Sequence, residues 1–179
     1  NTMLSVMDLA PRWGQNFNFI YRHMPFEKGK NQSWAIRTNF YFPGLFLNHS
    51  FQARFSVQES IGVFNRSYDI PLVDGFSYLP NSLVKNTLLF DYRLPLMYPD
   101  FSVGQFAYVK RIHGQFSVDY LNVHASSLAP KSLSAGLNFD FNLFKYNEPL
   151  FTFSVLGTYI NDVRVNNRIN PTFSFSYSY

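Results

Sequence analysis

Charged residues of both signs recur on the polar side of alternating segments, and their most plausible chemistry is pairing with one another. The set comprises Arg37, Arg54, Asp91, Arg93, Arg111, Asp119 and Asp140. Opposite charges that line an enclosed space can pair across it, whereas a solvated face usually carries more Lys and Glu. This pattern predicts a polar interior with ion pairs.

The same residues give little support to catalysis or metal binding. The chain has no Cys, which excludes thiolate metal sites and Cys nucleophiles. The four histidines are far apart and lack ligand spacing, and no GxSxG motif is present. His113, Ser117 and Asp119 share one predicted strand and point the same way, so they cannot converge by themselves. We therefore predict neither an enzyme nor a bound metal or cofactor.

Composition points to an aromatic β protein. The 179 residues include 21 Phe and 12 Tyr, only 15% are charged, and the net charge is +4. Only Lys110 and Arg111 are adjacent among the basic residues, so a nucleic-acid partner is not expected. Four lysines fall in predicted turns, where they suit the phosphates of anionic lipid head groups or lipopolysaccharide, or simply solvent: Lys28, Lys30, Lys131 and Lys145.

Apolar and polar residues alternate with a period of two in most of the chain, which predicts strands. The alternating segments are 15–23, 32–42, 49–57, 86–94, 105–120, 132–143, 150–159 and 171–179. Within 105–120 we place Tyr108 with Ile112 and Phe116 on the apolar side, and we assign Pro95 to a turn. The expectation is an all-β antiparallel protein of eight or nine strands, with no strong amphipathic helix.

Residues 59–83 have no steady period and contain two Gly and two Pro, which predicts a long loop. Its many large apolar residues, among them Ile70, Leu72 and Phe76, are unsuited to water. We expect this loop to fold inward against the strands.

The apolar side of the strands is dominated by aromatic residues, which favours a transmembrane β-barrel over a soluble β-sandwich or a lipocalin-like barrel. The last segment alternates strictly, with Phe173, Phe175, Tyr177 and Tyr179 opposite Ser and Thr. It resembles the terminal targeting strand of bacterial outer-membrane barrels, and an ordinary amphipathic edge strand is the alternative.

Three segments in order resemble the bacterial outer-membrane assembly and secretion superfamily, also called the surface-antigen family. Residues 64–69 (FNRSYD) resemble its Arg-Gly-Tyr/Phe loop motif, residues 91–96 (DYRLPL) its next strand, and Asp119 the lumenal acid of the strand after that. The resemblance implies that residues 1–179 are the C-terminal half of a sixteen-stranded barrel. It also implies that Arg66 of the long loop, which carries Tyr68 and Asp69 as well, meets Asp119 in a lumenal ion pair. Parity places Asp91 and Arg93 on the polar side of the neighbouring strand, where they can join this pair; the alternative is that Arg66 is a solvated loop charge.

The function implied by the resemblance is assembly or translocation of proteins at the bacterial outer membrane. The partners would be outer-membrane lipid and other outer-membrane or periplasmic proteins. Ser67 stands where the family motif has Gly. For that reason a non-catalytic barrel subunit that anchors a surface complex is kept as the alternative. A third class, a small-solute pore or an integral hydrolase, also stays open.

Overall fold

The computed structural model describes residues 9–26, 31–62, 69–76, 79, 83–99, 101–104, 106–122, 129–143, 150–162 and 168–178. These residues form a single antiparallel sheet without helices, so the expected all-β class is confirmed. The strands are β1 (Gly14–His23), β2 (Gln32–Pro43), β3 (Ser50–Ile61), β4 (Asn86–Met97), β5 (Phe101–Val103), β6 (Ala107–Leu121), β7 (Ser132–Leu143), β8 (Leu150–Ile160) and β9 (Ile169–Ser178). No helix long and apolar enough to cross a membrane occurs in this part of the chain.

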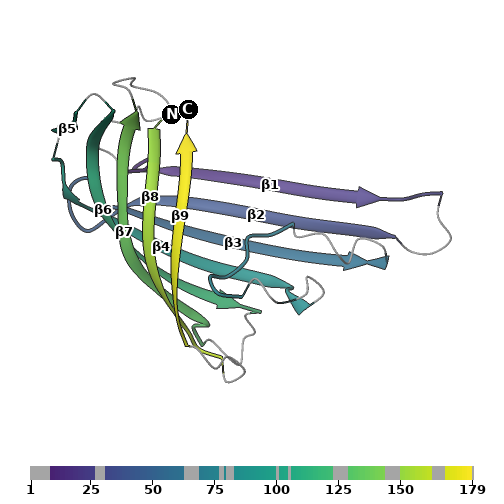
Figure 1. The fold of residues 1–179 in the computed structure, drawn as a ribbon. Helices are drawn as coiled ribbons and strands as arrows, with labels where there is room; N and C mark the ends of the chain where they lie inside the picture. The colour runs from purple at the N-terminus through teal and green to yellow at the C-terminus, as the bar shows by residue number, and fades with distance from the viewer. Residues whose placement is uncertain are drawn as a thin grey trace.

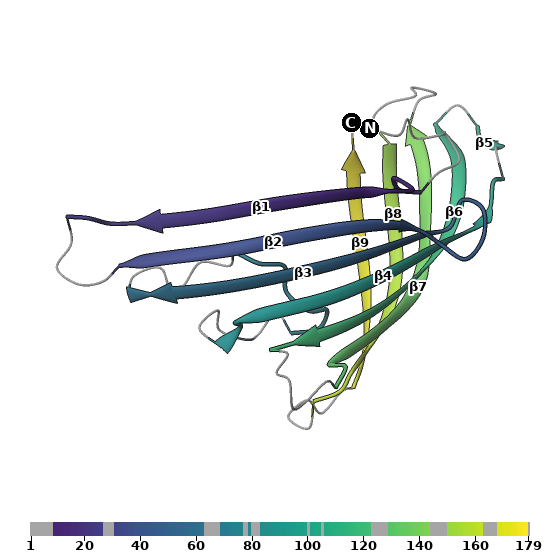
Figure 2. The ribbon, with the colours of Figure 1, turned by 180° about the vertical axis from the view of Figure 1, so that it is seen from behind.

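The strands follow one another in the sheet in the order β1-β2-β3-β4-β6-β7-β8-β9, and the short β5 pairs with β6. The sheet is strongly twisted and curved, and its two ends, β1 and β9, do not pair in the described residues (Figures 1 and 2). The sheet of this chain is therefore open. In the connection from β3 to β4, the described residues 69–76 lie on the concave side of the curve (Figures 1 and 2).

The two faces of the sheet have opposite chemistry. We call the concave side, which carries residues such as Ser117 and Asn138, the inner face, and the side that carries Phe116 and Phe153 the outer face. Among the described residues, eighteen buried side chains are polar or charged and seven are hydrophobic. On the outer face the large apolar side chains are exposed in many places, as at Phe116, Leu137 and Phe153. Period-two alternation produces both faces from the same strands.

Neighbouring aromatic side chains contact one another on the outer face. The rings of Phe51 and Phe90 stack at 5.8 Å between centroids, and those of Phe151 and Phe175 stack at 5.6 Å. Aromatic pairs on adjacent strands stabilise a sheet by roughly 0.2–1 kcal/mol each. These contacts cover much of the outer face with ring carbon.

Two local predictions are wrong because the register shifts. The pairing of β6 with β7 skips Lys110, so Tyr108 lies opposite Asn142 and therefore shares the inner face with it. An extra residue of this kind moves everything before it to the other face. Pro95 lies inside β4, next to a second irregularity between Pro95 and Met97, rather than in a turn. A bulge is one of the few places where a strand accommodates proline.

Candidate functional site: a loop segment docked on the inner face

Residues 69–76 of the β3–β4 connection pack against the inner face, and we call them the docked segment. Val73 and Phe76 are buried in a cluster with Leu89 of β4 and Ile160 of β8. Ile70 belongs to a second buried cluster, with Ala35 of β2 and Val84 just before β4. The segment therefore bridges strands that are far apart in the sheet. Burying a large apolar side chain contributes about 1.5–3 kcal/mol.

A charged anchor holds the first residue of the docked segment. Both carboxylate oxygens of Asp69 bind Nη1 of Arg22 on β1, and the Asp69 carbonyl accepts a hydrogen bond from Nε of Arg37 on β2. The Asp69 backbone N–H donates to Oε1 of Gln58 on β3 at 3.3 Å. Gln58 Nε2 in turn donates to the carbonyl of Val84 at 2.7 Å. Three successive strands thus hold one loop residue.

The other end of the segment is anchored on β6, β7 and β8. The backbone N–H of Asp74 donates to the Asp119 carboxylate at 3.2 Å, and Ser132 Oγ donates to the same carboxylate at 2.9 Å. Ser134 Oγ donates a hydrogen bond to Asp74 Oδ2 at 3.3 Å. The same hydroxyl lies 3.0 Å from Thr158 Oγ1 of β8. The Asp119 carboxylate therefore accepts a hydrogen bond from the backbone of the docked segment.

Gly75 fits the tight turn between these contacts. Its φ is +82°, and a Cβ at this position would lie 2.5 Å from Cδ1 of Ile160. Positive φ and close approach each favour glycine. Any larger residue would therefore force either the docked segment or the buried Ile160 side chain to shift.

The Asp74 carboxyl carries an electrostatic cost in the docked position. Burial raises its pKa above the ordinary value, the hydrogen bond from Ser134 lowers it, and the nearby Asp91 charge raises it further. Asp74 as a residue remains exposed, so water reaches part of it. Docking therefore slightly favours the protonated acid.

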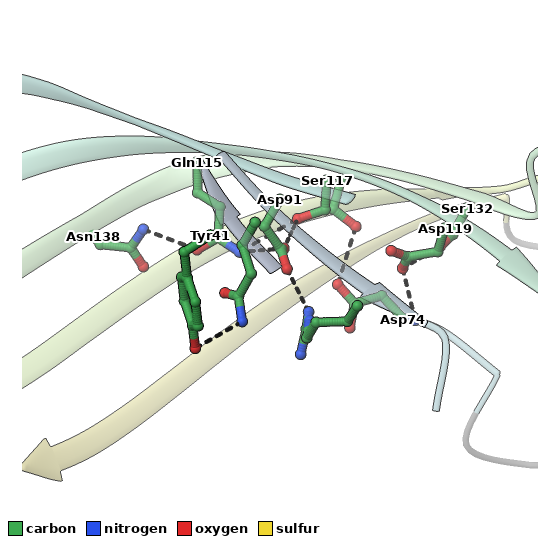
Figure 3. A network of polar contacts seen from close by, with 11 residues as sticks. Tyr41, Asp74, Asp91, Gln115, Ser117, Asp119, Ser132 and Asn138 are labelled. Atoms are coloured by element: carbon green, nitrogen blue, oxygen red, sulfur yellow. Dashed lines mark hydrogen bonds and ion pairs between the residues drawn. The ribbon is translucent and has the colours of Figure 1, made fainter. Parts of the chain in front are cut away.

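A second polar network crosses four strands beside the docked segment (Figure 3). Arg54 of β3 pairs with Asp91 of β4, and Asp91 also accepts from Ser117 at 2.8 Å and from Gln115 at 3.3 Å on β6. Gln115 Oε1 accepts from Asn138 of β7 at 3.3 Å. Each buried carboxylate oxygen has a donor, which is the condition for keeping charge inside a protein.

A third network lies further along the inner face. Asp140 of β7 accepts from Nε of Arg111 on β6, and from Thr152 Oγ1 of β8 at 2.6 Å. His113 Nδ1 lies 3.6 Å from the same carboxylate, beyond hydrogen-bond distance. His113 is buried, and its Nδ1 has no hydrogen-bond partner in the described structure. Asp140 is thus the centre of this group.

The structure brings some predicted site residues together and separates others. Asp69 lies in the docked segment and is bound by Arg22, and Asp119 anchors the other end of that segment, whereas Asp91 pairs with Arg54. Arg93 lies opposite Gln115 on the inner face, and its Nε is buried without a hydrogen bond. Arg66 and Tyr68 lie outside the described residues, so the Arg66–Asp119 pair stays a prediction.

The predicted terminal strand is β9. Phe173, Phe175 and Tyr177 lie on the outer face, opposite Val155, Phe153 and Phe151 of β8, and all three are exposed. Tyr179 is outside the described residues.

Sequence reasoning missed Arg22, Asp74 and Gln58 as part of this site. Arg22 and Asp69 are 47 residues apart. Parity alone places Arg22 beside Asn18 on the polar side of its strand, which was the one available signal. Asp74 acts partly through its backbone N–H, which no sequence pattern reveals.

Comparison of the chain with protein-family models, curated proteins and solved structures returns no match. No group of three or more His, Asp or Glu suited to a metal ion occurs in the residues that the structure describes. The fold and site together define an open antiparallel sheet with a charge-paired inner face, an aromatic outer face and a loop segment docked on the inner face.

Proposed function

We propose that this chain is part of an outer-membrane β-barrel that assembles or translocates proteins, with the docked segment inside the lumen. In this proposal further strands extend the open sheet from β1 and β9 and close it. The barrel would then be of the sixteen-stranded kind that the sequence resemblance implies. The outer face would meet lipid.

The observation that carries this proposal is the reversal of ordinary protein chemistry across the sheet. In a soluble protein, charged residues are almost never buried unless they are paired, and large apolar side chains are mostly inside. Here the buried side chains on the strands are mainly polar, and the exposed ones on the outer face are mainly aromatic. A membrane barrel has this arrangement because lipid replaces water on its outside.

The docked segment supports a gated rather than an open lumen. It combines an apolar cluster at Val73 and Phe76 with polar anchors at Asp69 and Asp74. Polar anchors can be exchanged for water when the segment leaves. A barrel that moves polypeptide through its lumen or wall needs such a removable obstruction.

Depletion of the protein in its native cell tests the proposal. We expect the amounts of other outer-membrane proteins to fall, as measured by quantitative mass spectrometry of the outer-membrane fraction. Complementation with Arg22→Ala should restore these amounts only in part, because the ion pair that holds the Asp69 carboxylate is lost. The matched control is Arg168→Ala, at an exposed residue just before β9, which should restore them fully.

Unchanged amounts of other outer-membrane proteins after depletion would contradict an assembly role. Stable co-purification with a surface protein complex would then favour an anchoring subunit. Loss of uptake of a small solute would instead favour a pore.

A further inference from the structure

The turn that joins β2 to β3 is an ordered structure with three consecutive apolar side chains at its tip. Gly44 N–H donates to the carbonyl of His49 at 3.1 Å, and His49 N–H donates to the carbonyl of Phe46 at 3.2 Å. Asn48 has a φ of 63°, which Asn tolerates better than most residues. A Cβ on Gly44 would lie 2.3 Å from Cβ of His49, so the turn requires glycine there.

The Tyr92 hydroxyl fixes this turn over the outer face. It accepts a hydrogen bond from Leu45 N–H at 3.3 Å and lies 2.7 Å from Nδ1 of His49. Tyr92 is on the outer face, since the adjacent Asp91 is bonded within the inner-face network. The turn therefore leans away from the inner face.

The tip side chains project into open space. Leu45, Phe46 and Leu47 are 84%, 71% and 79% exposed. The tip joins the aromatic outer face through His49, whose ring meets that of Phe46 edge-on at 5.3 Å and that of Tyr92 edge-on at 5.7 Å. The turn lies at the same end of the sheet as β5 (Figures 1 and 2), where Phe101 and other apolar residues are also exposed.

We infer that the tip Leu45–Phe46–Leu47 is a lipid anchor that inserts into the membrane leaflet at this rim of the sheet. The inference rests on the proposed function, in which the outer face lies in lipid. Lipid fits better than a protein partner because the three side chains protrude singly instead of lining a groove, and because they extend a surface already facing lipid. A rigid turn pinned by Tyr92 presents them at little entropic cost.

Single nitroxide labels test the inference, since the chain has no Cys and each introduced one is unique. Phe46→Cys reports on the tip, Phe153→Cys on the outer face of β8, and Arg168→Cys on an exposed site near the start of β9. The protein is reconstituted into phosphatidylcholine vesicles. Power-saturation EPR then compares collision with oxygen, which concentrates in lipid, with collision with a water-soluble nickel chelate.

We expect lipid-like accessibility at Phe46→Cys and Phe153→Cys, and water-like accessibility at Arg168→Cys. A lipid-like label at position 153 with a water-like label at position 46 would overturn the anchor and leave the barrel proposal standing. Water-like labels at both positions would overturn both. A position-46 label shielded from both reagents would indicate a protein partner or a second copy, and would also overturn the anchor.

Removing the Tyr92 hydroxyl tests whether this hydroxyl holds the tip in position, which simple exposure of the tip side chains would not require. In Tyr92→Phe, the label at position 46 should collide several-fold more often with the nickel chelate, because the turn is no longer held over the outer face. Tyr159→Phe, another outer-face tyrosine, is the matched control and should leave the label unchanged. An unchanged label depth in Tyr92→Phe would overturn the positioning role of this hydroxyl.

Discussion

The two faces of β7 have opposite chemistry. Asp140 is 1% exposed and is bonded to Arg111 and Thr152, while the adjacent Phe139 contacts Phe153 on the outer face at 6.4 Å between ring centroids. One strand therefore carries a satisfied buried charge and a layer of aromatic carbon. The comparison teaches that this sheet is held by polar pairing on one side and by contacts between aromatic rings on the other.

The largest expected effect comes from breaking the inner face at Asp140. Asp140→Ala leaves the Arg111 guanidinium partly buried without its carboxylate, and the loss of one partner of a buried pair costs about 3–5 kcal/mol. Urea unfolding in lipid vesicles measures the change in the free energy of unfolding. Phe139→Leu, one residue away on the outer face, should cost less than about 1.5 kcal/mol. Equal losses in the two variants would contradict the contrast between the faces.

A charge placed on the outer face tests the other side of the comparison. Phe153→Arg should lower the free energy of unfolding in vesicles by about 2–4 kcal/mol, because a guanidinium near the middle of the bilayer is poorly solvated. Phe106→Arg, on the exposed connection between β5 and β6, serves as the control at the rim and should cost about 0–1 kcal/mol. If both variants fold equally well, the outer face does not meet lipid at β8.

A smaller effect is expected where the docked segment meets the inner face. Gly75→Ala adds a Cβ that meets Ile160, and such overpacking costs roughly 1–3 kcal/mol beyond the strain of positive φ. Gly104→Ala is a matched control, since Gly104 also has positive φ (+61°) but its nearest neighbour would be 3.8 Å away. Limited proteolysis should cut the β3–β4 connection faster in Gly75→Ala than in Gly104→Ala. Similar rates would show that the contact with Ile160 does not hold the segment.

The smallest effect should be a pH dependence of docking. Because the Asp74 pKa is raised in the docked state, ionisation opposes docking. The free-energy cost of ionising Asp74 in the docked state is absent when the pH is below the ordinary pKa of Asp. It reaches its full size once the pH exceeds the raised pKa of Asp74. An acid-tolerant protease should therefore cut the β3–β4 connection more slowly at pH 4 than at pH 7. This difference between the two pH values should be larger in the unmodified protein than in Asp74→Asn. The same pH response in Asp74→Asn would assign it to another group.

Much of the strand pattern could be predicted from alternation. The predicted segment 132–143 coincides with β7, and its division into a Ser, Asn and Asp side and a Leu and Phe side matches the two faces. The prediction failed at Tyr108 and Pro95, because a bulge is a feature of pairing between strands and leaves no reliable mark on one strand alone.

The candidate site was predictable only in outline. Asp69 and Asp119 stood out through a motif, but their observed partners Arg22 and Ser132 depend on which strands lie beside the loop. Arg111 lies directly opposite Asp140, whereas Arg54 is opposite Leu89 and reaches Asp91 diagonally. The alternation along one strand predicts which face a charged residue occupies. The register between neighbouring strands decides which opposite charge it pairs with.

The sequence by itself determined the all-β class, most strand positions and the separation of polar from aromatic faces, because these follow from a local period of two. Only the tertiary structure decided that the sheet curves around residues 69–76, that Asp74 reaches Asp119 through its backbone, and that Tyr92 turns an apolar tip outward. Those arrangements depend on strand order, register and bulges, which arise from contacts between residues tens of positions apart.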